Sequence, residues 1–349
     1  MKIQITMKAL LLTSFGDKGV FRYTEDFPKP QIAPDEVLVR VKACALNHLD
    51  IWIRKGALAY KPPLPHILGS DVAGVVEEVG SLVKHVKPGD EVVVNPNLSC
   101  GVCEACLSGQ DNHCREFKIL GFQVKGGYAE YVKVPKENVI PKPKNLTFEE
   151  AASFPLTYIT AWNAVIDKGE IKPGDKVVVW GASSGVGVAA IQLAKLFGAT
   201  VIAITSSEWK AQKLKDLGAN YVINRKNQKV EEAVREISPE GVDLVIDHIG
   251  EETLPTSIKL LKKGGRLSFL GTTTGDRGIF NIRYNFVNEI KMNGVYMGRK
   301  STLFRIAELF ERGLLKPVVD KVFPLREGEK AHEYLESGNH FGKVVLKVE

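Results

Sequence analysis

The chain has 349 residues, of which 44% are hydrophobic and 25% charged, and its formal net charge is +6. This length predicts about two domains, and the composition is ordinary for a globular protein. The sequence contains no block of like charges that would indicate nucleic-acid binding. No apolar run reaches the roughly 18 residues needed to cross a bilayer.

The first part of the chain, up to about residue 155, contains short apolar or alternating runs separated by glycine and proline. Four such runs are typical of β-strands, at 36–42, 72–79, 90–94 and 129–134. This texture predicts a β-rich domain.

A cysteine cluster lies within this part, in a loop over residues 98–115. Four of the five cysteines follow the spacing C-x2-C-x2-C-x7-C: Cys100, Cys103, Cys106 and Cys114. Four thiolates complete a tetrahedron around Zn²⁺ and leave no open position, which is typical of a structural site. We therefore expect one structural Zn²⁺ per chain. The N-terminal sequence lacks the pattern of a signal peptide, and the cysteines are better explained as metal ligands than as disulfides. Both observations favour a cytoplasmic protein.

The middle of the chain, about 156–289, alternates strands with helices. The expected strands are 176–180, 200–204, 221–223, 243–246 and 266–270, and the expected helices are 186–197 and 209–217. Such alternation predicts βαβ units and a parallel sheet.

The first of these strands runs into a glycine-rich turn, GASSGVG, from Gly181 to Gly187. Glycines allow the backbone to approach a pyrophosphate, and the N-terminus of the following helix offers free N–H groups. A plain tight turn is the alternative, but a strand before the turn and a helix after it indicate a dinucleotide site. The candidate cofactor residues here are Gly181, Ser183, Ser184, Gly185, Val186 and Gly187.

The tip of the next strand bears on the choice of cofactor. An acidic residue there would bind the ribose 2′-hydroxyl of NAD, but the strand ends in Thr205, Ser206 and Ser207. Hydroxyls with Lys210 nearby could bind a 2′-phosphate, and Arg225 is a second candidate. We therefore expect NADP(H) rather than NAD(H). The alternative interpretation of Lys210 is a solvent-exposed helix residue with no role in cofactor binding. Glu208 should point away from this site.

The tail, from about residue 290, holds a predicted helix over 303–312 and a closing strand over 342–348. The strand has the texture of the first zone, so the tail should pack back onto it. The expected division is 1–155 with 290–349 in one domain, and 156–289 in the other.

Several motifs together resemble the medium-chain dehydrogenase/reductase superfamily. They are the run GSDVAGVV from Gly69, PGDEV from Pro88, GGYAEY from Gly126, TYITAW from Thr157 and GKVV from Gly342. The cysteine loop is similar to that of zinc alcohol dehydrogenases, whereas ALNHLD from Ala45 looks more like quinone oxidoreductases. The resemblance implies a GroES-like catalytic domain, an α/β Rossmann domain with a doubly wound parallel sheet, and an active site between them. It also implies a homodimer or homotetramer, paired through edge strands near 294–297.

The resemblance also implies a second, catalytic zinc, but this chain replaces its ligands. The three ligand positions fall on Asn47, Ser70 and Leu156, and these side chains cannot bind zinc as thiolates and imidazole do. Cys44 stands an odd number of residues from Asn47, so a strand would aim it at the opposite face, and we expect a buried, inert thiol. The chemistry should therefore proceed without a catalytic metal.

Without the metal, other groups must stabilise the charge that builds on the substrate oxygen. The candidate catalytic residues are Asn47, His48, Asp50, Ser70 and Thr160. Asn47 is the expected N–H donor, and Ser70 or a water could assist it. His48 would serve the cofactor pyrophosphate or a proton relay, unless it is a packing residue. Asp50 would orient its neighbours, with a structural salt bridge as the alternative.

The resemblance further implies that Thr160 packs on the nicotinamide. It places the rest of the nicotinamide pocket at Gly271, Thr272, Met297 and Gly298, for which loop geometry is the alternative explanation. The histidines at 66, 85, 113, 248, 332 and 340 receive no functional role.

Three functions are compatible with these residues. The first is an NADP(H)-dependent oxidoreductase of the alcohol dehydrogenase type, acting on an aldehyde, ketone or alcohol. The second is a quinone or enone reductase, which the loss of the zinc ligands favours, because a conjugated acceptor needs less activation than an isolated carbonyl. The third is an NADPH-binding protein without catalytic activity.

Overall fold

The computed structural model describes residues 5–349, which divide into two units. Unit 1 runs up to Leu156 and resumes from Arg299 to Glu349, and unit 2 is Thr157–Gly298. Within the described residues, no helix combines the length and apolar character needed to span a membrane.

Unit 1 is built mainly of strands. Its strands are β1 (Thr6–Leu12), β2 (Phe21–Pro28), β3 (Glu36–Ala45), β4 (Asp71–Val79), β5 (Glu91–Val94), β6 (Asn97–Leu98), β7 (Lys118–Ile119), β8 (Tyr131–Pro135), β9 (Val139–Pro141), β16 (Val319–Pro324) and β17 (Lys343–Lys347). Its helices are α1 (His48–Lys55), α2 (Glu104–Leu107), η1 (Asp111–His113), η2 (Lys136–Asn138), α3 (Phe148–Ala152), α10 (Lys300–Glu311), η5 (Leu325–Glu327) and α11 (Gly328–Glu336). The four runs predicted as strands correspond to β3, β4, β5 and β8.

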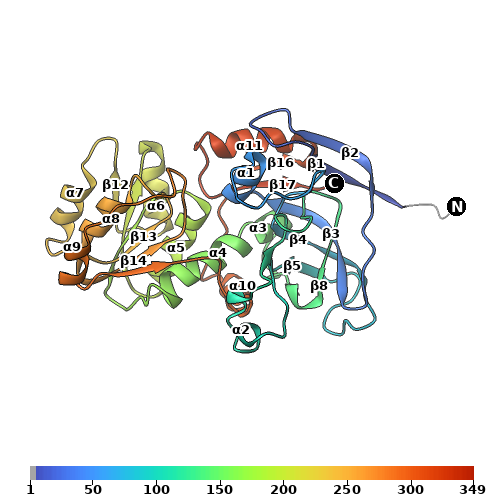
Figure 1. Ribbon diagram of the computed structural model, residues 1–349, viewed down its shortest axis with the longest axis horizontal. Coiled ribbons are helices and arrows are strands. Elements are labelled where there is room, and N and C mark those ends of the chain that lie inside the picture. Colours follow the sequence, from blue (N-terminus) through green and yellow to red (C-terminus); the bar gives the residue numbers. More distant parts are fainter. Residues whose placement is uncertain (1–4) are drawn as a thin grey trace. The chain divides into compact units, whose positions relative to one another are not determined.

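The main sheet of unit 1 has the strand order β16-β17-β3-β4-β5-β9, and β8 pairs with β3. Strand β3 alternates valines and leucines with polar residues, and its β-branched side chains fill the core. The last strand of the chain, β17, pairs antiparallel with β3, so the red C-terminal strand lies beside blue and green segments in Figure 1. The tail therefore packs back onto the first zone, as predicted.

Unit 2 alternates strands and helices. Its strands are β10 (Lys176–Val179), β11 (Thr200–Thr205), β12 (Tyr221–Asn224), β13 (Val242–Asp247), β14 (Leu261–Phe269) and β15 (Lys291–Gly294). Its helices are η3 (Asn163–Asp167), α5 (Gly185–Leu196), η4 (Glu208–Lys210), α6 (Ala211–Leu217), α7 (Val230–Ile237), α8 (Leu254–Leu260) and α9 (Ile282–Val287), and α4 (Pro155–Trp162) joins the two units in sequence.

The six strands of unit 2 are all parallel, in the order β12-β11-β10-β13-β14-β15. Numbered within the unit, this order is 3-2-1-4-5-6, the arrangement of the dinucleotide-binding fold. Helices α5 to α8 lie among these strands in Figure 1. The predicted doubly wound sheet is thereby confirmed.

Some local predictions differ from the structure. The helix expected over 209–217 begins as the 3-10 turn η4 and becomes α-helical only at Ala211. Strand β14 starts at Leu261, five residues before the expected start, because its first part continues the ladder beside β13. Helices α1, α7 and α8 were not predicted; each has only seven or eight residues.

Candidate active site

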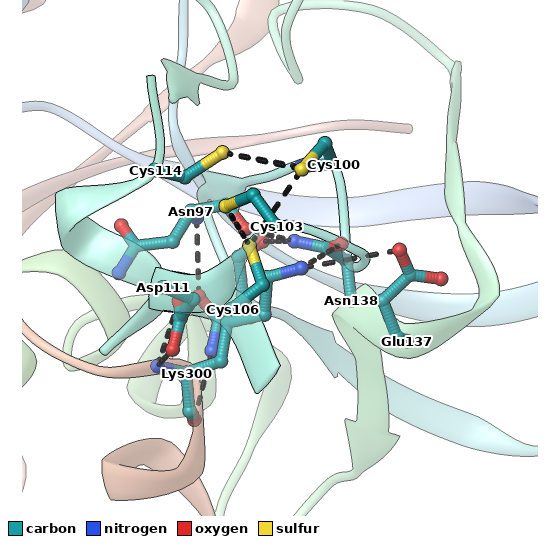
Figure 2. Close-up of polar contacts among 10 residues, drawn as sticks. Asn97, Cys100, Cys103, Cys106, Asp111, Cys114, Glu137, Asn138 and Lys300 are labelled. Carbon is teal, nitrogen blue, oxygen red and sulfur yellow. Dashed lines mark hydrogen bonds and ion pairs between the residues drawn. The ribbon is translucent and has the colours of Figure 1, made fainter. Parts of the chain in front are cut away.

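The four clustered cysteines lie together in a loop between β6 and β7. Their ligand atoms all fall within 4.8 Å of one another. Neighbouring sulfurs are 3.5 Å (Cys103–Cys106), 3.6 Å (Cys100–Cys114) and 3.9 Å (Cys100–Cys106) apart. A tetrahedron with metal–sulfur bonds of about 2.3 Å has edges of roughly 3.8 Å, so the cluster has the size of a four-thiolate zinc site. Figure 2 shows the four sulfurs gathered at one point.

The backbone of this loop favours thiolates. The pKa of Cys100 is lowered to about 7, chiefly by the backbone N–H groups of Val102 and Cys103. Thiolates are the form that binds zinc, so the loop is electrostatically prepared for a cation. His113 is exposed and lies outside the cluster.

Buried polar side chains attach the loop to helix α10. Asp111 accepts the backbone N–H of Lys300 at 3.0 Å, and Asn138 Nδ2 donates to the carbonyl of Asn97 at 2.6 Å. Lys300 Nζ also reaches Asn138 Oδ1 at 3.4 Å, as the dashed lines of Figure 2 show. These contacts support the loop independently of any metal.

The three positions at which the resemblance implies catalytic zinc ligands converge on Asp71, the first residue of β4. Asn47, the N-cap of α1, donates from Nδ2 to Asp71 Oδ2 at 2.9 Å. The backbone N–H of Leu156 donates to Asp71 Oδ1 at 2.7 Å. Ser70 precedes Asp71 in the chain, and its buried Oγ has no hydrogen-bond partner among the described residues.

A residue that sequence reasoning missed completes this group. Lys343, the first residue of β17, donates from Nζ to Asn47 Oδ1 at 2.6 Å and to Asp71 Oδ2 at 2.9 Å. The side chain of Lys343 is 4% exposed and that of Asp71 is fully buried. We call Asn47, Asp71 and Lys343 the buried triad. The only signal in the sequence was a lysine at the start of a strand with an apolar centre.

Asp50 lies beside the buried triad on helix α1. Its carboxylate accepts the backbone N–H groups of Asn47 at 2.8 Å and Gly69 at 3.2 Å. Burial raises the pKa of Asp50 to about 6, and these two hydrogen bonds oppose that rise. Asp50 therefore holds the backbone on both sides of the buried triad.

Cys44 is fully buried on β3, and burial raises the pKa of its thiol well above the usual range. A Cβ atom at Gly69 would lie 2.7 Å from its sulfur and 2.4 Å from Tyr128 Cδ1. The predicted burial of Cys44 is confirmed, and this packing leaves the thiol unreactive. His48 is only partly buried, with its ring 6.4 Å from those of Trp52 and His340.

Unit 2 holds the glycine-rich turn in the geometry of a nucleotide site. Ser184 caps helix α5, its Oγ accepting the N–H of Gly187 at 3.0 Å. Gly181 has a φ of +52°, and a Cβ there would lie 2.6 Å from the ring of His248. A Cβ at Gly187 would lie 2.5 Å from the carbonyl oxygen of Gly181. Both glycines are therefore required by close packing.

His248, at the end of β13, is a second residue that sequence reasoning missed. Its Nε2 is 3.3 Å from Ser184 Oγ, and burial lowers its pKa. A Cβ at Gly271 would lie 2.2 Å from the carbonyl oxygen of His248. The glycine turn, His248 and the Gly271–Thr272 segment thus form one continuous surface at the carboxyl ends of the central strands.

The tip of β11 also faces the glycine turn. Lys210 is 5% exposed, and its Nζ donates to Ser183 Oγ at 3.1 Å. Glu208 accepts from Asn224 Nδ2 at 3.0 Å, so its carboxylate is engaged with the end of β12. Arg225 pairs with Glu252 at 3.1 Å on the surface. Of the two predicted cations, Lys210 therefore contacts the turn and Arg225 pairs with an acid.

Three of the residues expected at the nicotinamide, Thr160, Met297 and Gly298, also come together within unit 2. Thr160 Oγ1 lies 3.8 Å from Met297 Sδ, and Asn163 Nδ2 donates to the Met297 carbonyl at 2.8 Å. Met297 has a φ of +51°, and a Cβ at Gly298 would lie 2.7 Å from the carbonyl oxygen of Ile159. This segment is therefore held tightly against helix α4.

Comparisons with known proteins agree with this geometry. The family profile "Alcohol dehydrogenase GroES-like domain" matches residues 33–144, and "Zinc-binding dehydrogenase" matches residues 185–312. The chain is 35% identical to an NAD-dependent alcohol dehydrogenase of Sulfolobus acidocaldarius, over 98% of this chain and all of that one. It is 32% identical to a quinone oxidoreductase of Mus musculus, over 98% of both chains.

A solved structure is more similar still. The crystal structure of an NAD-dependent alcohol dehydrogenase superposes with a TM-score of 0.95 at 48% identity, over 98% of this chain and all of the other. At this coverage the similarity extends over both units.

Proposed function

The chain belongs to the medium-chain dehydrogenase/reductase superfamily and is an alcohol-dehydrogenase-like oxidoreductase, and on that premise we propose that it catalyses hydride transfer between NADP(H) and an aldehyde, ketone or alcohol without a catalytic zinc. The observation that carries the proposal is the buried triad: Asn47 stands at one of the implied zinc-ligand positions, and its partner Asp71 also accepts the backbone N–H of Leu156, at a second such position, and pairs with Lys343. We propose that unit 1 is the catalytic domain and unit 2 the dinucleotide-binding domain; residues 290–298, expected in the catalytic domain, belong to unit 2, because β15 completes its parallel sheet.

The nicotinamide, when bound, would supply or accept the hydride, and the protein would position it and stabilise charge. Asn47 is our candidate for the N–H donor to the oxygen at which negative charge builds. Its Nδ2 carries two hydrogens, and Asp71 accepts one of them. Ser70 Oγ, which has no partner among the described residues, would assist directly or through water.

The cofactor would lie on the surface formed by the glycine turn and the ends of β11, β13 and β14. The free N–H groups at the start of α5 suit a pyrophosphate. Thr160, Met297 and Gly298 would form the wall behind the nicotinamide. His48 and Asp50 would act from unit 1, His48 toward the cofactor or a proton relay and Asp50 through its backbone contacts.

The preference for NADP(H) rests on the tip of β11. Thr205, Ser206 and Ser207 offer hydroxyls there, and Lys210 supplies a positive charge. A carboxylate at this tip would repel a 2′-phosphate, and Glu208 is engaged with Asn224 instead. NAD(H) is the alternative, which the names of the two NAD-dependent relatives favour.

The cysteine loop would hold one structural Zn²⁺ and stabilise the catalytic domain. None of the described cysteines forms a disulfide, which is consistent with thiols that serve as metal ligands. On this basis we propose a cytoplasmic location.

We also propose a homodimer or homotetramer that pairs through β15, one of the two edge strands of the parallel sheet. Large apolar side chains just before this strand are exposed: Ile279 at 89%, Ile282 at 72% and Phe286 at 65%. Unpaired strand edges and apolar patches of this kind are typical of interfaces. Light scattering that gives the 38.4 kDa mass of one chain would contradict this proposal.

A quinone or enone reductase is the second candidate. A side-chain amide is a weaker electrophile than Zn²⁺, and a conjugated acceptor needs less activation than an isolated carbonyl. The relationship to a mouse quinone oxidoreductase supports this candidate. The family is one of enzymes, so we do not retain the interpretation as a binding protein without catalytic activity.

Metal analysis combined with a panel of NADPH-oxidation assays tests the proposal. We expect one zinc per chain and turnover of aldehydes or ketones. Two tightly bound zincs per chain would contradict the zinc-free mechanism. Activity on 1,4-quinones or enones, with none on simple ketones, would select the second candidate.

A further inference from the structure

The buried triad forms a closed electrostatic unit. Asp71 accepts three hydrogen bonds, from Lys343 Nζ, Asn47 Nδ2 and the backbone N–H of Leu156. Lys343 bridges Asp71 and the Asn47 carbonyl oxygen. Two of the three positions expected to bind zinc thus contact the carboxylate that Lys343 neutralises.

This arrangement determines the orientation of the Asn47 amide. An ammonium group can only donate hydrogen bonds, so the atom facing Lys343 must be the amide oxygen. An ionised carboxylate can only accept them, so the atom facing Asp71 must be the amide nitrogen. The amide therefore cannot flip without placing two donors or two acceptors together, and its second N–H keeps one direction.

The charge on Lys343 is essential to this orientation. Its side chain is 4% exposed and Asp71 is fully buried, so solvent cannot replace either partner. Asp50 is a second buried carboxylate nearby, and the charge of Lys343 lowers its pKa while that of Asp71 raises it. The positive charge of Lys343 thus pairs with Asp71 and also acts on Asp50.

We propose that Lys343 is a positioning residue that replaces the catalytic metal as the fixed positive charge of this site, holding and polarising Asn47 as the hydrogen-bond donor to the reacting oxygen. This inference rests on the proposed function. An ammonium group linked to an amide carbonyl draws electron density from the amide, which makes its remaining N–H a stronger donor. Lys343 acts through Asn47 and does not itself need to reach the substrate.

The test compares two substitutions at position 343 with a control on the same strand. Lys343→Met removes the charge, and Lys343→Arg retains it. Lys347→Met is the matched control, because Lys347 lies at the exposed end of β17. We expect Lys343→Met to lower kcat by ten- to a hundredfold with the KM for NADPH changed less than twofold, Lys343→Arg to recover part of kcat, and the control to match the wild type.

A second variant separates positioning from folding, because Lys343→Met leaves the Asp71 carboxylate buried without its counter-ion. The double variant Lys343→Met/Asp71→Asn removes both charges and should fold with one zinc per chain. We expect its kcat to remain at least tenfold low. Wild-type kcat in the folded double variant would overturn the inference while leaving the proposed function intact. Absence of turnover in the wild-type enzyme would instead contradict the proposed function.

Discussion

Asn47 Nδ2 donates to Asp71 Oδ2 at 2.9 Å. This hydrogen bond holds the Asn47 amide in one orientation at a position where a metal ligand was expected. Replacing Asn47 with Ala should remove the proposed donor while leaving the Lys343–Asp71 pair in place. We expect kcat to fall by about a hundredfold, the magnitude typical of losing one oxyanion donor. The KM for NADPH should change less than twofold. Steady-state kinetics with Ser70→Ala as the comparison would measure this, and unchanged turnover would remove Asn47 from the mechanism.

Lys210 should determine the discrimination between the two nicotinamide cofactors. Its loss in Lys210→Ala removes one charge-assisted contact, worth about 1.5–3 kcal/mol or roughly a ten- to hundredfold change. We therefore expect kcat/KM for NADPH to fall by at least about tenfold, and that for NADH to change less than threefold. Lys213→Ala, at an exposed position on α6, is the control. A wild-type preference for NADH, or equal losses for both cofactors, would show that Lys210 does not read a 2′-phosphate.

Removal of the structural metal should affect stability before chemistry. We expect Cys103→Ser to abolish the single bound zinc and to lower the Tm by about 5–15 °C, since metal binding contributes directly to folding. Cys44→Ala should keep one zinc per chain, because Cys44 lies on β3 outside the cluster. Metal analysis and thermal unfolding give both quantities. Zinc retained by Cys103→Ser would mean that the metal binds elsewhere.

Asp50 should make stability depend on pH in a defined window. Its pKa is about 6 in the folded protein and about 3.9 in an unfolded chain, so the folded state holds the proton more tightly. Its contribution is present in full below pH 4 and is lost as the pH rises through 6, by about 3 kcal/mol in all.

The matched variant is Asp50→Asn, which cannot titrate. The free energy of unfolding of the wild type, measured relative to Asp50→Asn by urea denaturation, should decrease between pH 4 and pH 7. Taking this difference cancels other groups that titrate in the same window, such as His66, whose pKa burial lowers to about 4. A difference that stays constant with pH would contradict a raised pKa at Asp50.

Features that depend on local spacing could be predicted from the sequence. The intervals between Cys100 and Cys114 define a four-thiolate site without knowledge of the fold, and the turn after β10 defines a nucleotide loop because strand, glycines and helix are contiguous. The structure confirms the doubly wound sheet, and the cysteines lie within 4.8 Å of one another.

Features that depend on distant contacts could not be predicted. Lys343 meets Asp71 across 272 residues, and nothing in the strand GKVV gives its register against β3. His248 approaches Ser184 across 64 residues in the same way. Asn47 was recognised as a lost zinc ligand, but its role as the N-cap of α1 was not, because a single polar residue before a short helix is a weak signal.

The pairing of β17 with β3 also sets an order of events during synthesis. Strand β3 leaves the ribosome roughly 300 residues before β17, so the sheet of unit 1 stays unfinished while all of unit 2 is made. Lys343 arrives on the last strand, after Asn47 and Asp71 have long been available. A chain interrupted before Gly342 would contain every cysteine of the zinc loop and every residue of the nucleotide turn, yet it would leave a buried acid without its cation. Synthesis of β17 is therefore the step that completes the buried triad.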